Sequence, residues 1–149
     1  MKALTIDIRR AEPRDAEAIS DVHQHAWRGA YAGIIPHRAL NTMLQRRGAP
    51  WWRRAISRSA YVLVADCGGT IAGYATLGPN RARLLPQMGE IYELYIRPEY
   101  QGVGLGSRLF SSALHCLSEQ GLKGTVVWAL AENDIALDFY RGAGGRDVA

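Results

Sequence analysis

Apolar residues recur along this chain with two periods, and the period changes from one segment to the next. Alternation, or a short apolar run bounded by turn residues, is typical of β-strands and occurs in LTIDIRRA (4–11), AYVLVAD (60–66), IAGYATLG (71–78), GEIYELYIRP (89–98) and KGTVVWALA (123–131). The turn CGGT separates the second of these segments from the third, so the pattern predicts a hairpin there.

Helical spacing of apolar residues predicts the remaining elements. The clearest case is GLGSRLFSSALHCLSEQG (104–121), and the others are EPRDAEAISDVHQHAWRGAY (12–31), a less regular region from 34 to 57, and NDIALDFYRGAGG (133–145), which closes on glycines. The order is β-α-α-β-β-β-α-β-α. We therefore predict a mixed α/β (α+β) fold with an antiparallel first half, in which the helix over 104–121 connects two parallel strands.

Composition indicates one globular domain over residues 1–149. The 149 residues are 48% hydrophobic and 21% charged, which is ordinary for a globular protein, and no apolar run is long enough to span a membrane. The first residues lack the apolar core of a signal peptide, and Cys67 and Cys116 form no framework pattern, so we expect reduced thiols and a cytoplasmic location. The net charge of +4 favours an anionic partner.

A glycine-rich turn joins the strand ending near residue 98 to the helix that follows. The segment IRPEYQGVGLGSRL (96–109) has neither the lysine of a phosphate loop nor the spacing of a dinucleotide fingerprint. Backbone N–H groups at a helix N-terminus have no internal partner and attract anions, and glycines let a ligand approach the main chain. The turn therefore predicts a phosphate-binding site, with a purely structural turn as the alternative.

The same segment resembles the acetyl-CoA signature [RQ]-x-x-G-x-G/A of the GCN5-related N-acetyltransferase (GNAT) superfamily, with Gln101, Gly104 and Gly106 at the fixed places. The later segment VVWALAENDIALDFYRGAGG (126–145) resembles the family's strand, asparagine and short helix ending in Phe-Tyr and glycine. The resemblance covers residues 6–145. It implies the GNAT acyl-CoA N-acyltransferase fold and an enzyme that moves an acetyl group from acetyl-CoA to a primary amine by direct attack in a ternary complex.

The resemblance also implies a cofactor site. Leu94, Tyr95 and Ile96 match the strand whose backbone pairs with the pantetheine arm, and Asn133 matches a residue that hydrogen-bonds this arm. The pyrophosphate cradle corresponds to Gln101, Gly102, Val103, Gly104, Leu105, Gly106 and Ser107.

The catalytic residues implied by the resemblance suit amine acetylation. Tyr140 matches the tyrosine that protonates the leaving thiolate. A free alkylamine has a pKa of about 10.4, so a base must take a proton before the amine attacks. Glu90 falls where some family members carry this base and is our preferred candidate; Glu93, which strand alternation places on the opposite face, and a water chain are the alternatives.

Trp27, Tyr31 and Ile34 lie where the family builds its acceptor pocket, although simple helix packing also explains them. The acceptor class is left open between a small-molecule and a peptide amine. The four histidines have no metal-ligand spacing, so we expect no metal site.

Other classes of function stay open. One is a non-catalytic acyl-CoA-binding or sensing module on the same fold. Another is a basic nucleic-acid-binding domain using WWRRAISR (51–58), although such a stretch is more often an amphipathic helix with tryptophans inward and arginines outward. We expect no membrane or nucleic-acid partner. Family members usually continue with two more strands after the last helix, whereas this chain stops at GRDVA (145–149), so we expect that strand pair to be missing or truncated. The resemblance also allows a homodimer.

Overall fold

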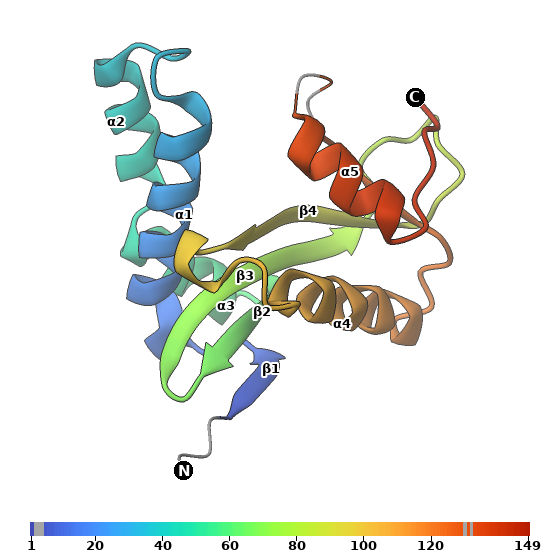
Figure 1. Ribbon diagram of the computed structural model, residues 1–149, viewed down its shortest axis with the longest axis horizontal. Coiled ribbons are helices and arrows are strands. Elements are labelled where there is room, and N and C mark those ends of the chain that lie inside the picture. Colours follow the sequence, from blue (N-terminus) through green and yellow to red (C-terminus); the bar gives the residue numbers. More distant parts are fainter. Residues whose placement is uncertain (2–4, 130, 132) are drawn as a thin grey trace.

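Figure 1 shows the computed structural model of the chain, which describes residues 1, 5–129, 131 and 133–149. The elements are β1 (Ile6–Arg10), α1 (Ala16–Tyr31), α2 (His37–Arg46), α3 (Ala49–Ser57), β2 (Tyr61–Cys67), β3 (Thr70–Pro79), β4 (Gly89–Ile96), α4 (Leu105–Glu119), β5 (Thr125–Val127) and α5 (Asp134–Gly142). No helix in the described part of the chain is long and apolar enough to cross a membrane.

The mixed α/β class and the order of elements are as predicted, with one additional helix. The irregular region between residues 34 and 57 divides into α2 and α3. The division falls at Gly48, which has extended backbone angles, and Pro50 occupies the first turn of α3. A proline has no N–H to donate into a preceding turn, so the chain begins a new helix there instead of continuing α2.

The sheet has the spatial order β1-β2-β3-β4-β5. Neighbouring strands from β1 to β4 are antiparallel, and β5 lies parallel to β4. The last strand is shorter than the predicted 123–131 segment, because only Thr125–Val127 pair with β4. Leu4 and Leu130, which the sequence pattern includes in the first and last strands, lie outside the described residues.

Helices cover both faces of the sheet (Figure 1). On one face, α1 and α3 contribute Ile19, Val22 and the fully buried Trp52 to a core that includes Val64 and Tyr74 of the sheet. On the other face, the stripe of α4 predicted from the sequence packs against the alternate strand residues; this second core contains Leu63, Ala75, Leu77, Ile91, Leu109, Ala113 and Leu117. The result is a three-layer arrangement of helix, sheet and helix.

Strand β4 contains one extra residue opposite β3. Thr76 pairs with Glu93 but Leu77 pairs with Ile91, so Tyr92 has no counterpart in β3 and forms a β-bulge. The prediction that Glu90 and Glu93 lie on opposite faces is therefore wrong. Ile91 and Leu94 both pack toward α4, so the neighbouring residues Glu90 and Glu93 both point to the face covered by α1 and α3.

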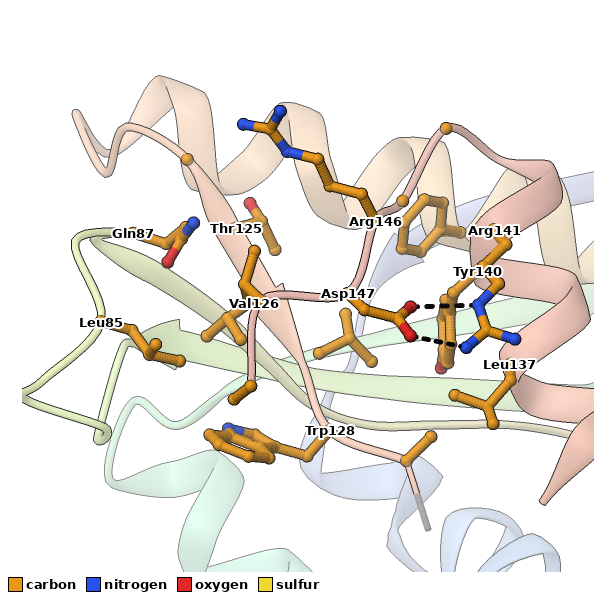
Figure 2. A pocket seen from close by; sticks show the side chains of 18 of the residues that line it. Leu85, Gln87, Thr125, Val126, Trp128, Leu137, Tyr140, Arg141, Arg146 and Asp147 are labelled. Carbon is orange, nitrogen blue, oxygen red and sulfur yellow. Dashed lines mark hydrogen bonds and ion pairs between the residues drawn. The ribbon is translucent and has the colours of Figure 1, made fainter. Parts of the chain in front are cut away.

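The chain after α5 runs back beside the sheet. The described residues 143–149 contain no strand, and the Arg141 guanidinium donates to both carboxylate oxygens of Asp147 at 3.0 and 2.7 Å. This exposed ion pair holds the C-terminal segment against α5, as Figure 2 shows.

Candidate active site

The glycine turn lies where the sequence predicts it, between the end of β4 and the start of α4. Gly102 and Gly104 have φ angles of +81° and +79°, in the left-handed region that residues with a Cβ rarely adopt. Gly104 is the N-cap of α4, and its carbonyl accepts the N–H of Arg108 at 3.1 Å. Among the described residues, the N–H groups from Val103 to Ser107 donate no hydrogen bond, so this helix N-terminus presents free donors to an anion.

Two other residues of the turn have local structural roles. The Gln101 side chain donates from Nε2 to the carbonyl of Ile96 at 3.1 Å, which ties the turn to the end of β4. A Cβ built on Gly106 would lie 3.5 Å from the Phe139 ring, an ordinary contact distance. The turn is therefore braced on one side by β4 and on the other by α5.

Strands β4 and β5 diverge beside this turn. Their last paired residues are Ile91 and Val127, while β4 continues to Ile96 with β3 as its neighbour. Leu94, Tyr95 and Ile96 thus lie in a part of β4 that has no β5 partner among the described residues. Backbone groups on this edge can pair with an extended ligand, as an added strand would.

Helix α5 brings Tyr140 toward the divergence. Its ring packs against Phe110 of α4 and against Phe139, with centroid distances of 5.6 and 5.3 Å. Burial raises the pKa of Tyr140, so its hydroxyl stays protonated at neutral pH and can donate a proton. Asn133 is the N-cap of α5, and its Oδ1 accepts the N–H of Ala136 at 3.2 Å, which leaves the side-chain amide N–H groups for other partners.

A cavity of about 550 Å³ lies between α4, α5, β5 and the C-terminal segment (Figure 2). Tyr140 lines it on the α5 side, and Trp128, which is 55% exposed, lines it beyond the end of β5. One side of the Tyr140 ring therefore faces an open space.

Glu93 is at the centre of a polar cluster on the opposite face of the sheet. Arg47, at the junction of α2 and α3, donates to both carboxylate oxygens of Glu93 at 2.7 and 3.2 Å. The same guanidinium lies 4.4 Å from the ring centroid of Trp51 and 4.7 Å from that of Trp52. The Tyr74 hydroxyl donates to Glu93 at 3.2 Å as well. Glu93 is thus held by an arginine whose guanidinium packs against two adjacent aromatic rings.

Glu90 also pairs with an arginine, but this partner is exposed. The Glu90 side chain is 2% exposed and accepts the backbone N–H and the Nη2 group of Arg81, at 2.9 and 2.8 Å. The Arg81 side chain is 68% exposed and lies 4.0 Å from the ring centroid of Tyr92. The Arg81 guanidinium can leave Glu90 for water more readily than Arg47 can leave Glu93.

The structure packs together the side chains of two of the three predicted acceptor residues and leaves the third exposed. Trp27 and Tyr31 are neighbours on α1, with ring centroids 4.9 Å apart. Burial raises the pKa of Tyr95 on β4. Glu93, Tyr31 and Tyr140 are close enough to Tyr95 to raise this pKa further, so Tyr31 lies near the place where β4 and β5 diverge. Ile34 is 74% exposed. None of the three predicted residues lines the cavity of Figure 2.

Sequence reasoning missed the partners of Glu93. Arg47 is one of two consecutive arginines before Gly48, and no spacing distinguishes it from the arginines that are exposed on α3. The sequence signal that could have identified Arg47 is the helix break at Gly48-Ala49-Pro50, which two tryptophans follow directly. The inward direction of Trp52 agrees with the amphipathic explanation of residues 51–58, since Arg53, Arg54 and Arg58 are exposed.

His23 of α1 is buried beside this cluster. Its side chain is 1% exposed, its Nε2 lies 4.0 Å from Glu93, and neither ring nitrogen has a hydrogen-bond partner among the described residues. Burial lowers the pKa of His23 to about 4, helped by the positive charge of Arg47 and opposed by Glu93. Within the described residues, no three histidine, cysteine or acidic side chains are grouped so that they could hold a metal ion.

Comparison with known proteins places this geometry in a family. A family model described as the acetyltransferase (GNAT) family matches residues 18–144. A protein of Bacillus subtilis named uncharacterized N-acetyltransferase YuaI is 28% identical over 97% of this chain and 82% of its own length. Two solved structures share the fold. The PaiA N-acetyltransferase of Thermoplasma acidophilum in complex with coenzyme A has a TM-score of 0.75 at 21% identity, over 93% of this chain and 88% of the other. The aminoglycoside N-acetyltransferase AAC(6')-Iy in complex with CoA has a TM-score of 0.77 at 12% identity, over 99% and 92%.

The burial of His23 predicts a stability that depends on pH. The pKa of His23 falls from 6.5 to about 4 on folding, so the unfolded chain binds this proton first as the pH decreases. The contribution is complete above pH 6.5 and is lost as the pH falls through about 4. Replacement of His23 by Leu should reduce the fall in unfolding free energy over this range by about 3 kcal/mol. Denaturant titrations at several pH values measure this, with the exposed His25→Leu as control. An unchanged pH dependence in His23→Leu would contradict the assignment.

Proposed function

The chain belongs to the acetyltransferase (GNAT) family, and we propose that it transfers the acetyl group of acetyl-CoA to a primary amine by direct attack in a ternary complex. One observation carries the proposal. The N-terminus of α4, with its free N–H groups, is joined by the glycine turn to the segment of β4 that β5 leaves unpaired, so a candidate phosphate site lies close in sequence to a strand-pairing edge. A molecule that carries both a pyrophosphate and an extended amide-containing arm matches that combination.

The residues at this place fit acetyl-CoA. When bound, the cofactor supplies an acetyl group activated as a thioester. The N–H groups of residues 103–107 would hold the pyrophosphate, and the left-handed glycines keep side chains away from it. The open edge of β4 at Leu94, Tyr95 and Ile96 would pair with the amide arm, and the amide N–H groups of Asn133 would donate to the same arm.

Glu90 is the base that we prefer. An ammonium group must give up a proton before its nitrogen can attack, and a buried carboxylate can accept that proton. The acceptor's ammonium would replace the exposed guanidinium of Arg81 at Glu90, which keeps the carboxylate paired with a cation until the proton moves. Glu93 is the alternative base, because an ammonium would displace Arg47, which packs against Trp51, less readily than it would displace Arg81.

Tyr140 is the proposed acid. Its hydroxyl would donate a proton to the sulfur as the carbon–sulfur bond breaks and the new carbon–nitrogen bond forms. The raised pKa of the buried phenol keeps this proton in place until the thiolate develops. Backbone N–H groups of β4 beyond Ile91 would stabilise the negative charge on the acetyl oxygen. The second proton of the amine nitrogen, lost as the amide forms, would restore the Tyr140 phenol, and the proton on Glu90 would pass to water. The products are the N-acetylated amine and CoA with a free thiol.

Replacement of Gly104 by Val should abolish the rise in melting temperature that CoA or acetyl-CoA produces, because a β-branched residue cannot adopt φ of +79° without strain and would block the phosphate site. Gly121→Val is the matched control, since Gly121 has φ of +76° with open space around it beyond the other end of α4. Both variants should lose stability, but only Gly121→Val should keep the cofactor effect. An unchanged effect in Gly104→Val would mean that the turn is only structural.

Replacement of Glu90 by Gln should lower the acetylation rate mainly below neutral pH or shift the pH profile, while acetyl-CoA binding stays nearly unchanged, because a base acts on the chemical step. Release of free CoA thiol in the presence of a primary amine measures the rate. Glu93→Gln is the comparison. If Glu93→Gln alone changes the profile, the two roles are reversed, and if neither variant does, a water chain carries the proton.

Replacement of Tyr140 by Phe keeps the ring contacts with Phe110 and deletes only the hydroxyl. We expect kcat to fall on the order of 10²-fold with KM little changed, because the proton is needed only as the thiolate leaves. Steady-state kinetics measure the loss, and thermal unfolding serves as the control for packing. Full kcat in this variant would remove Tyr140 from the mechanism.

A further inference from the structure

A second cavity, of about 560 Å³, lies between α3 and strands β2 to β4 and reaches Gln120 at the C-cap of α4. Its walls are mainly aromatic and apolar, and they include Trp51, Trp52, Tyr61, Leu77 and Tyr92. This volume is within the range of small-molecule sites.

The cavity reaches the place where the strands diverge. On β4 it is lined by Tyr92 and Glu93, which directly follow Ile91, the last β4 residue that pairs with β5. Arg81, the partner of the proposed base Glu90, also lines it. An amine placed at Glu90 would therefore have this cavity beside it for the rest of the molecule.

The charged groups along the cavity are already neutralised. Arg47 and Glu93 bind each other through two hydrogen bonds, and the Arg47 guanidinium packs against Trp51 and Trp52. Arg81 is paired with Glu90. Among the described residues that line this cavity, Arg81 is the exposed cation, and its displacement from Glu90, which lies beside the lining, would let the reacting ammonium take its place.

We propose that this cavity holds the tail of the acceptor, and that it selects primary amines whose tail is uncharged and apolar or aromatic. The proposal rests on the proposed acetyl transfer and names the substrate class of that reaction. Arg47 and Glu93 already bind each other, so a second ammonium in the tail would have to displace Arg47 from Glu93, and a carboxylate would have to displace Glu93 from Arg47. Either charge would lose its water without finding a free partner.

The test uses three amines of equal length that differ only at the far end: pentylamine, 1,5-diaminopentane and 5-aminopentanoate. Calorimetric titration into the CoA-bound protein gives Kd, and CoA release from acetyl-CoA gives kcat/KM. Pentylamine should bind and react at least roughly tenfold better than either charged analogue. Trp51→Ala should weaken pentylamine binding, because it removes the half-buried ring that forms one wall. Equal or better binding of either charged analogue, or an unchanged Kd for pentylamine in Trp51→Ala, overturns the proposal.

A pair of variants tests the charge argument directly. Arg47→Met keeps an apolar chain beside the tryptophans but leaves the Glu93 carboxylate without its cation, so the preference should shift toward 1,5-diaminopentane by roughly tenfold. The double variant Arg47→Met/Glu93→Gln has no charge at this place and should again prefer pentylamine. If the single variant does not fold, the double variant decides alone, and a preference for the diamine in the double variant overturns the proposal.

The two proposals fail in different ways. If pentylamine binds with the stated preference but no amine in the panel is acetylated, the proposed reaction is wrong and the cavity assignment stands. If acetylation proceeds but favours the diamine or the amino acid, the reaction stands and the cavity assignment is wrong.

Discussion

The bulge in β4 is the constraint on which the arrangement of the candidate site depends. If Tyr92 paired with β3 as a regular strand residue, alternation would turn Glu90 and Glu93 to opposite faces, and one of them would be buried among the leucines of α4. With the bulge, both carboxylates point away from α4, and the apolar residues Ile91 and Leu94 both pack against it. The bulge also falls directly after the last pair between β4 and β5, so the same residue re-aims the side chains and marks the start of the open edge.

The ion pair between Arg47 and Glu93 connects this bulge to the helices above it. Burying two charges is favourable only if their hydrogen bonds are well formed, and here both carboxylate oxygens are used, with Tyr74 as a further donor. The tryptophans at the start of α3 pack against the guanidinium, and the Arg47 side chain is 25% exposed. Breaking this ion pair would leave an unpaired, largely buried charge at the bulge. The pair therefore fixes the junction of α2 and α3 beside the second cavity, which Arg47 lines.

Much of the fold could be predicted because local patterns specify it. Helical spacing over 104–121 predicted α4, which buries Leu105, Leu109, Ala113 and Leu117, and the glycine turn was predicted at the start of this helix. The bulge was missed, although Ile91 and Leu94 in GEIYELYI are three residues apart, which departs from regular alternation; only the pairing with β3 shows which residue is extra. Arg47 was not assigned either, because the helix break at Gly48 marks a turn of the chain but not the partner of Arg47, which lies 46 residues away. Long-range pairs of this kind arise from packing, which a single sequence does not display.

The two faces of β4 therefore serve different tasks in the proposed reaction. The face toward α4 is apolar and rigid, and it positions the turn and α5, from which the phosphate-binding N–H groups and Tyr140 come. The opposite face carries carboxylates whose charges are balanced by arginines, one packed against tryptophans and one exposed. The base would take a proton from the amine on one side of β4, and the acid would give a proton to the sulfur on the other side, beside α5. The open edge of β4 between them is where the acetyl group would pass, so separation of base and acid follows from the sheet itself.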